Sequence, residues 1–331
     1  MTKNVFLIGT EHQMSQVEYA IKHFQLDTMS IIIIIDNSDQ NQSFISKINK
    51  NTSFINVLTF DNWTFKDLIF NKSKSKQYTS MCQNFVKHEV VFFASHYSTD
   101  ATLLFKSIVK PVQMYLMDEG NASFLVKTKR IENKWNDKIK FLIKSFLYKK
   151  WIQLPKKLVY FTRFNFDLPQ KDSAVIYSVT QIQNPLKQLI TNELSFIGSS
   201  IVELKMISEI NYLLFLQIII AKHSHLIKIF KYYPHRKECP KKLELISRMG
   251  FEIVQIGEPF ESWFSKQTNV SEVLCSFYTT GVIYNIEGAN HNVPKLIIYK
   301  FDSNLLKIHK KIYEDIYTTF KKNKKIIFET L

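Results

Sequence analysis

Short apolar runs alternate with amphipathic stretches along most of this chain. In its first half, apolar runs at 4–9, 29–36, 54–60, 90–95 and 112–117 are separated by segments with helical spacing such as "QMSQVEYAIKHF". Continuous apolar strands rich in Ile and Val are typical of a parallel sheet that helices cover on both faces. The pattern therefore predicts a doubly wound α/β domain.

A second series of the same kind follows a polar stretch. Its expected strands are "LSFIGSS", "HLIKIFKYYPH", "FEIVQIG", "EVLCSFYTT" and "PKLIIYKF". A chain of 331 residues is also longer than one hydrophobic core usually supports. We therefore predict two doubly wound, Rossmann-like domains, 1–175 and 176–331, which face each other across a cleft.

Polar residues follow several of the predicted strands. Ligands of open α/β sheets bind outside the carboxyl ends of the strands, so these positions are candidates for a site. A carboxylate can take a proton from a hydroxyl, and a His beside an Arg, or hydroxyls that precede a helix, can bind phosphate. The candidates are Gln13, Asp118, Glu119, Gly120, Gly198, Ser199, His235, Arg236, Ser276, Thr279 and Thr280.

Each of these candidates also has a structural explanation. The segment 118–120 can be a turn that needs only polar residues and a Gly with positive φ. A lone His at a strand end is more often a surface or core residue than a catalyst, and Ser or Thr before a helix is usually an N-cap. Their common placement at strand ends is what favours a functional role.

Positive charge is concentrated in one segment. The net charge is +15, and residues 127–163 hold twelve Lys or Arg against two acidic residues. Within this segment, apolar residues from Trp135 to Trp151 recur at steps of three and four, the pattern of an amphipathic helix. A basic amphipathic helix suits an anionic membrane surface, although an ordinary packing helix with a solvated face fits the pattern equally well. A second basic stretch, 307–328, is also expected to be an amphipathic helix.

Other features narrow the class of protein. No RNP motif, zinc-finger spacing or basic-aromatic platform is present, so nucleic acid is not an expected partner. The longest apolar stretch, 212–221, is about half of what a membrane span needs. The three cysteines form no paired framework, which suits a reducing compartment. Two pairs of residues each supply only part of a metal site: His223 with His225, and His235 with Cys239. We therefore expect no metal. Together, the short apolar stretches and the unpaired cysteines lead us to expect a cytoplasmic protein.

The order of the motifs resembles a known enzyme family. "FLIGTEHQMSQVEYAI", "YLMDEGNAS", "FIGSSIVE", "YYPHRKE", "EPFESWF" and "SFYTTGVI" are similar to segments of glycosyltransferase family 52, the lipooligosaccharide and capsule sialyltransferases of bacteria, which have the GT-B fold. Related bacterial polysialyltransferases share the acidic and His motifs. One departure is that the family commonly has His-Pro, whereas Pro234 precedes His235 here.

The resemblance implies an inverting, metal-independent transfer of sialic acid from CMP-sialic acid to a terminal galactoside, without a cofactor. Asp118 or Glu119 would be the base, with Glu203 as the competing candidate, and His235 would assist the departing CMP. Gln13 and Gly120 would lie on the acceptor side, in the N-terminal domain. The implied donor-binding residues, in the C-terminal domain, are Gly198, Ser199, Arg236, Pro259, Glu261, Ser276, Thr279 and Thr280.

Two other functions remain open from the sequence. A transferase that uses CMP-Kdo or a UDP- or GDP-sugar would keep the same architecture. A non-catalytic protein that binds glycans at a membrane surface would need only the basic helices. The acceptor of a sialyltransferase would be a lipooligosaccharide or capsular glycan. We therefore expect the protein on the inner face of the cytoplasmic membrane. A homodimer is one assembly that the sequence allows.

Overall fold

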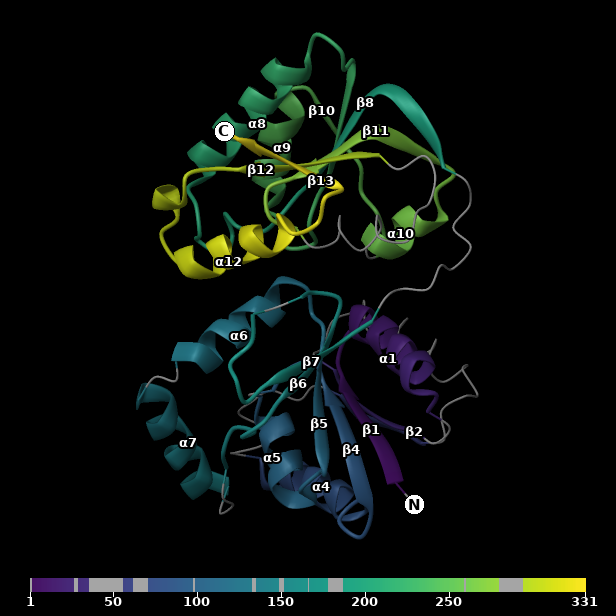
Figure 1. Ribbon diagram of the computed structural model, residues 1–331, viewed down its shortest axis with the longest axis vertical. Coiled ribbons are helices and arrows are strands. Elements are labelled where there is room, and N and C mark those ends of the chain that lie inside the picture. The colour runs from purple at the N-terminus through teal and green to yellow at the C-terminus, as the bar shows by residue number, and fades with distance from the viewer. Residues whose placement is uncertain are drawn as a thin grey trace. The chain divides into compact units, whose positions relative to one another are not determined.

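The computed structural model describes residues 2–26, 29–35, 56–61, 71–97, 99–132, 135–148, 152–165, 167–177, 187–258, 260–279 and 294–331. The chain divides into two compact units, Met1–Tyr177 and Ser178–Leu331 (Figure 1). Each unit has its own parallel sheet. The predicted fold class, two Rossmann-like α/β domains, is therefore confirmed.

The N-terminal unit contains a seven-stranded sheet. Its strands are β1 (Thr2–Ile8), β2 (Met29–Ile35), β3 (Asn56–Asp61), β4 (Glu89–Ala94), β5 (Gln113–Met117), β6 (Val159–Thr162) and β7 (Ser173–Ile176). They lie in the order β3-β2-β1-β4-β5-β6-β7. The chain builds outward from β1 in one direction and from β4 in the other. The boundary between β1 and β4 is therefore a topological switch point, where ligands of such sheets bind.

Helices of the N-terminal unit connect these parallel strands. They are α1 (Glu11–Phe24), α4 (Lys72–Gln83), α5 (Asp100–Val109), α6 (Asn121–Glu132) and α7 (Trp135–Tyr148). The side chains of Thr10 and Thr99 cap α1 and α5, because each hydroxyl accepts a hydrogen bond from a backbone N–H of the first turn. These caps fix where each chain leaves its strand and enters its helix.

The C-terminal unit repeats the plan with six strands. They are β8 (Gln188–Ile197), β9 (Ile229–Tyr233), β10 (Phe251–Ile253), β11 (Asn269–Ser276), β12 (Lys295–Lys300) and β13 (Ile326–Thr330), in the order β10-β9-β8-β11-β12-β13. The helices are α8 (Glu209–His223), α9 (Pro240–Arg248), α10 (Phe260–Lys266), the short 3-10 helix η1 (Ser303–Leu305) and α12 (Lys310–Phe320). The switch point here lies between β8 and β11.

Aromatic side chains join neighbouring strands in both cores. Phe93 on β4 stacks against Phe6 on β1, with ring centroids 4.4 Å apart, and against Tyr115 on β5 at 4.9 Å. In the C-terminal unit, Phe196 on β8 stacks against Tyr232 on β9 at 5.6 Å. Offset aromatic pairs of this kind add stability beyond the area they bury. They join neighbouring strands whose carboxyl ends carry several of the residues predicted for the site.

One element prediction was partly wrong. The basic stretch 307–328 was expected to be one amphipathic helix, but α12 ends at Phe320 and residues 326–330 form β13. Ile326 pairs with Leu296 of β12, so the apolar end of the stretch completes the sheet. The turn between them is closed by hydrogen bonds such as that from the N–H of Asn323 to the carbonyl of Phe320.

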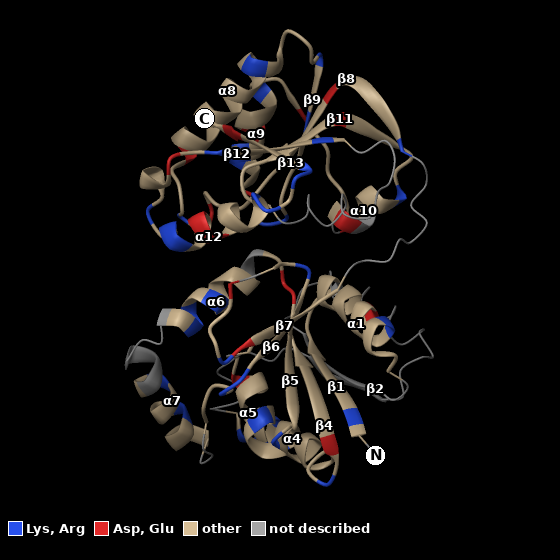
Figure 2. Cartoon of the chain, in the orientation of Figure 1, with Lys and Arg blue, Asp and Glu red and all other residues tan. Residues whose placement is uncertain are grey.

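The basic segment 127–163 differs from a helix with a fully solvated cationic face. Figure 2 shows Lys and Arg along α6 and α7, but Arg130 is buried and pairs with Asp172 at 2.5 Å. Lys144 pairs with Asp100 at 3.0 Å. Part of the local charge therefore stabilises the fold from within. No helix in the described part of the chain is both long enough and apolar enough to span a membrane.

The apolar stripe of α7 is exposed rather than packed. Phe146 keeps 83% of its surface exposed, and Ile139, Leu142, Ile143 and Leu147 are also exposed. Trp135 and Trp151, the two ends of the predicted stripe, lie outside the described side chains. The opposite side of the helix is attached to the unit, because the hydroxyl of Ser145 accepts a hydrogen bond from the N–H of Ile152. The alternative that α7 is an ordinary packing helix therefore does not fit its surroundings.

Candidate active site

The turn after β1 holds one of the predicted residues in place. Gln13 is buried in the first turn of α1, and its Oε1 accepts a hydrogen bond from the N–H of Gly9 at 2.6 Å. The side chain therefore folds back across the turn from strand to helix. Its Nε2 donates a hydrogen bond to Oε1 of Glu119 at 2.6 Å. A residue predicted to lie on the acceptor side thus contacts the predicted base.

Asp118 is a structural carboxylate. It is 1% exposed and accepts hydrogen bonds from the hydroxyl of Ser123 at 2.7 Å and from that of Thr162 at 3.2 Å. Ser123 belongs to α6 and Thr162 ends β6, so this carboxylate joins the ends of β5 and β6 to the next helix. A buried acid whose two oxygens both accept hydrogen bonds from neighbouring elements is suited to holding those elements together.

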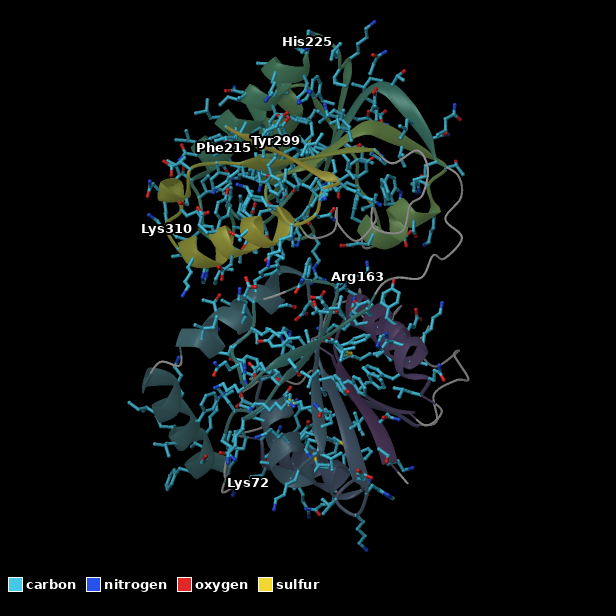
Figure 3. All side chains as sticks on the ribbon, in the orientation of Figure 1. Lys72, Arg163, Phe215, His225, Tyr299 and Lys310 are labelled. Carbon is cyan, nitrogen blue, oxygen red and sulfur yellow. The ribbon has the colours of Figure 1, made fainter. Side chains whose placement is uncertain are left out.

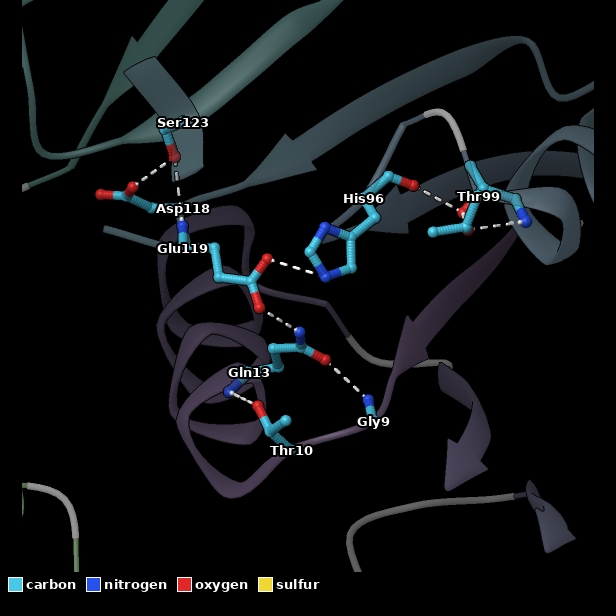
Figure 4. Close-up of polar contacts among 9 residues, drawn as sticks. Gly9, Thr10, Gln13, His96, Thr99, Asp118, Glu119 and Ser123 are labelled. Atoms are coloured by element: carbon cyan, nitrogen blue, oxygen red, sulfur yellow. Dashed lines mark hydrogen bonds and ion pairs between the residues drawn. The ribbon is translucent and has the colours of Figure 1, made fainter. Parts of the chain in front are cut away.

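Glu119 points away from Asp118, toward the switch point of the sheet (Figure 4). Its backbone N–H donates to the hydroxyl of Ser123 at 3.1 Å, and its carboxylate lies between Gln13 and His96. The next residue, Gly120, has φ of 61°, in the left-handed region that glycine adopts at little cost. The turn at Gly120 leads from the end of β5 into α6.

His96 completes this cluster and was not predicted from the sequence. It follows β4, and its Nε2 lies 3.0 Å from Oε2 of Glu119. The hydrogen bond to Glu119 raises the pKa of His96, against the opposing effect of partial burial. The backbone of His96 is also fixed, because its carbonyl accepts a hydrogen bond from the hydroxyl of Thr102 at 2.6 Å. The signal that could have found it was its place at a strand end beside β1 and β5.

The cluster lies where three neighbouring strands end. Gln13 follows β1, His96 follows β4 and Glu119 follows β5, and these strands are adjacent in the sheet. Next along the same edge, Arg163 follows β6, with its guanidinium 5.0 Å from the ring centre of Tyr19 and 5.4 Å from that of Tyr177 (Figure 3). The edge therefore presents an acid–base pair beside a cation.

In the C-terminal unit, Gly198 has a steric purpose at the end of β8. A Cβ atom at this position would lie 2.3 Å from Oε1 of Glu238 and 2.6 Å from the hydroxyl of Tyr232. The buried Glu238 accepts hydrogen bonds from Tyr232 at 2.7 Å and from the N–H of His235 at 2.8 Å. Glycine thus leaves the room in which Glu238 holds the His235 loop against the sheet.

His235 is an exposed residue with a lowered pKa. Desolvation by its surroundings, together with the charges of Arg236 and Lys237, lowers the pKa of His235 to about 4. Its Nδ1 accepts a hydrogen bond from the N–H of Lys237 at 3.2 Å, which places the proton of the neutral ring on Nε2. His235 can therefore donate a hydrogen bond to an anion, while the positive charge comes from Arg236 and Lys237.

Glu203, the competing candidate for the base, is tied to α9. It accepts hydrogen bonds from the N–H of Cys239 at 3.0 Å and from the fully buried Lys242, whose Nζ also pairs with Glu238 at 3.1 Å. Partial burial acts to raise the pKa of Glu203, but these hydrogen bonds prevail and the pKa is lowered. A carboxylate held in its charged form at a helix start is suited to anchoring the helix rather than to accepting protons.

The remaining predicted residues have varied surroundings. Ser276 is wholly buried, and its hydroxyl donates to the carbonyl of Ile197 at 3.0 Å, which favours a role in joining β8 to β11. Ser199 is buried, whereas Thr279 and Glu261 are half-buried. Pro259 and Thr280 lie outside the described residues. Ser199 and Thr279 nevertheless follow β8 and β11, on either side of the switch point of this sheet.

The described side chains include no group of three or more His, Cys, Asp or Glu that could hold a metal ion. The C-terminal unit does offer hydrogen-bond donors that suit an anion. The available donors are the ring of His235, Arg236, Lys237 and the backbone that follows β8 and β11.

Comparisons with known proteins agree on the fold. No family model matches the sequence, and no curated protein matches it. Among solved structures, Arabidopsis thaliana UGT89C1 superposes with a TM-score of 0.51 at 8% identity, covering 99% of this chain and 85% of that one. TarM superposes with a TM-score of 0.51 at 9% identity, covering 91% of this chain and 85% of that one. At such low identity the likeness concerns the fold, which is that of the GT-B glycosyltransferases.

Proposed function

We propose that the chain is a glycosyltransferase that moves sialic acid from CMP-sialic acid to a terminal galactoside. The observation that carries the proposal is the cluster of Gln13, His96 and Glu119 at the switch point of the N-terminal sheet. A positioned acid–base pair at such a place suits removal of a proton from an attacking hydroxyl. The GT-B fold and the motif resemblance to the family 52 sialyltransferases support the same reaction class.

The C-terminal unit would bind the donor. In the proposed reaction, negative charge develops on the CMP phosphate as its bond to the sugar breaks. Arg236 and Lys237 supply positive charge, and the Nε2–H of neutral His235 supplies a hydrogen bond. Backbone donors and hydroxyls after β8 and β11, including Ser199 and Thr279, would complete the phosphate site.

The N-terminal unit would bind the acceptor. Gln13 and Gly120 keep their proposed acceptor-side role as residues that orient Glu119, since Gln13 holds its carboxylate and Gly120 forms its turn. The acid–base pair lies at the carboxyl ends of β4 and β5, so an acceptor hydroxyl would approach along this edge of the sheet.

We also propose that the protein works at an anionic membrane surface, where a glycolipid acceptor is found. The exposed stripe of α7 would enter the headgroup region, and the Lys residues around it would attract anionic lipids. A lipid surface accounts for both the apolar stripe and the positive charge of the same segment.

Competition binding tests the choice of donor. Labelled CMP should be displaced by unlabelled CMP at much lower concentration than by UDP or GDP, and His235→Ala should weaken CMP binding. The matched control is His225→Ala, since His225 is an exposed residue that precedes β9, whereas His235 follows it. Tighter binding of UDP or GDP would indicate that the donor is a UDP- or GDP-sugar rather than CMP-sialic acid. A transfer assay with each CMP-sugar would distinguish CMP-sialic acid from CMP-Kdo.

A further inference from the structure

We propose that His96 is the catalytic base that takes the proton from the acceptor hydroxyl, and that Glu119 is the residue that positions it. This inference rests on the proposed function and assigns the roles within its acid–base pair. It changes the role implied by the motif resemblance, in which Glu119 itself takes the proton.

Accessibility is the first argument for His96. Its side chain is 51% exposed, whereas that of Glu119 is 20% exposed. The oxygen of Glu119 that faces His96, Oε2, is itself buried. The other oxygen, Oε1, accepts the hydrogen bond from Gln13 at 2.6 Å. A substrate hydroxyl therefore reaches the imidazole more easily than the carboxylate.

The tautomer of His96 is the second argument. The carboxylate of Glu119 can only accept, so its Oε2, which lies 3.0 Å from Nε2, favours the neutral tautomer with the ring proton on Nε2. The lone pair is then on Nδ1, which has no hydrogen-bond partner among the described residues. A His oriented by a carboxylate on one nitrogen, with its other nitrogen open, is the arrangement that proton transfer requires.

The chain of contacts behind the pair fixes its geometry. The N–H of Gly9 holds Gln13, Gln13 holds Glu119, and Glu119 holds His96 (Figure 4). Within the described part of the chain, the charged group in contact with the His96 ring is Glu119. The neighbouring elements contribute uncharged residues, namely Thr102 of α5, which bonds the backbone of His96, and Gln13 of α1, which bonds Glu119. The carboxylate of Glu119 is accordingly the group that raises the pKa of His96, and a substitution can remove it.

The proposed step balances as follows. The acceptor oxygen forms a bond to the anomeric carbon, and the bond from that carbon to the CMP phosphate oxygen breaks, with its electron pair leaving on the phosphate. The hydroxyl proton moves to Nδ1 of His96. The resulting imidazolium keeps its Nε2–H directed at Glu119, whose negative charge stabilises it.

Rates measured against pH test the assignment. For the parent, kcat/KM should fall as pH drops through the raised pKa of His96, because only the neutral ring accepts a proton. His96→Gln should lower kcat roughly a hundredfold or more and remove this acidic limb. Glu119→Gln should also lower kcat, but should keep the limb and move it to lower pH, because the carboxylate that raises the pKa is gone.

The opposite pattern would overturn the assignment. If Glu119 were the base, Glu119→Gln would remove the limb and His96→Gln would retain most of the activity. His88→Gln is the matched control, since His88 is exposed and precedes the same strand that His96 follows. It should behave as the parent.

An NMR titration of the imidazole nitrogens gives a readout that does not need turnover. It should show the neutral ring of His96 protonated on Nε2, with a pKa that falls in Glu119→Gln. Protonation on Nδ1, or a pKa unchanged by Glu119→Gln, would contradict the inference. If the parent transfers no sugar from any nucleotide donor, the proposed function fails; if the parent is active and His96→Gln is equally active, the inference alone fails.

Discussion

Asp118 and Glu119 are neighbours in the sequence, but their carboxylates have different surroundings. Asp118 is buried against Ser123 and Thr162, whereas Glu119 lies in the cluster with Gln13 and His96. Asp118→Asn should destabilise the fold by about 1–3 kcal/mol, because an amide replaces an acceptor that meets buried donors. Glu119→Gln should leave the melting temperature nearly unchanged and lower turnover.

Thermal unfolding and initial rates, measured on both variants, check this division of roles. Gly120→Ala would serve as a third variant, since φ of 61° should make it cost stability through the backbone. A stable Asp118→Asn protein with strongly reduced turnover would show that Asp118 also takes part in the reaction.

Gly198 gives a second prediction at the scale of single residues. Gly198→Ala should destabilise the protein by about 1–3 kcal/mol, because the new methyl group would overlap with Glu238 and Tyr232. It should also weaken CMP binding, since Glu238 holds the N–H of His235. Gly257→Ala is the matched control, because no atom lies within 4 Å of its added Cβ.

Denaturant unfolding and CMP titration of both variants supply the measurements. Equal stability of Gly198→Ala and Gly257→Ala would mean that the tight contact at β8 is relieved without cost. If Gly198→Ala is destabilised but keeps its affinity for CMP, the His235 loop does not contribute to nucleotide binding.

Sequence reasoning found the ends of strands more readily than the contacts between them. Gln13, Glu119 and Gly120 were predicted because each follows an apolar run. His96 also follows such a run, but its meaning depends on a contact with Glu119 across the sheet, which no local pattern contains. The buried position of Ser276 was missed for the same reason, because its hydroxyl is used by the carbonyl of Ile197 on the next strand.

At the scale of elements, α7 is the helix whose surface needs an explanation. Ile143→Ser together with Phe146→Ser should reduce binding to vesicles that contain phosphatidylglycerol by roughly a hundredfold or more, because each apolar side chain contributes roughly 1.5–3 kcal/mol when buried. Binding should also weaken as salt rises, since exposed charges are screened over roughly 8 Å at physiological ionic strength. Co-sedimentation measures both effects.

Ile210→Ser is the control for this experiment. Ile210 is 78% exposed on α8 in the other unit, so its replacement removes exposed apolar surface away from the basic segment. Activity on a soluble acceptor should be unchanged in the α7 variant. Unchanged co-sedimentation of that variant would exclude the stripe as a lipid-binding surface.

Helices and strands were predicted correctly where the hydrophobic pattern continued over a whole element, and one prediction failed near the end of the chain. The strands of the two sheets follow from their continuous apolar runs, and α1 follows from its helical spacing and its Thr10 cap. In the segment 307–328, the short run Ile326–Phe328 fits either a helix face or a strand. Its pairing with β12, a contact distant in sequence, decides in favour of the strand.

At the scale of the whole molecule, composition and pattern were enough to predict two Rossmann-like units. The donor could not be derived in the same way, because one fold carries many donors and the choice lies in a few side chains around the phosphate and the base. The motif resemblance narrows the donor to CMP-sialic acid, and that step remains a prediction.

Independence from metal ions is a prediction for the intact protein. Transfer should persist in excess EDTA, since Arg236, Lys237 and the Nε2–H of His235 are proposed to meet the charge of the departing phosphate. Initial rates with and without chelator are the measurement. Loss of activity that a divalent ion restores would point to a transferase in which the metal carries that charge.

The most direct test of the account is the rate of sialic acid transfer from CMP-sialic acid to a terminal galactoside by the parent and by Glu119→Gln. The account predicts transfer by the parent and a rate lower by roughly a hundredfold or more in the variant, with CMP affinity unchanged. Absence of transfer by the parent, or equal rates in the two proteins, would contradict it.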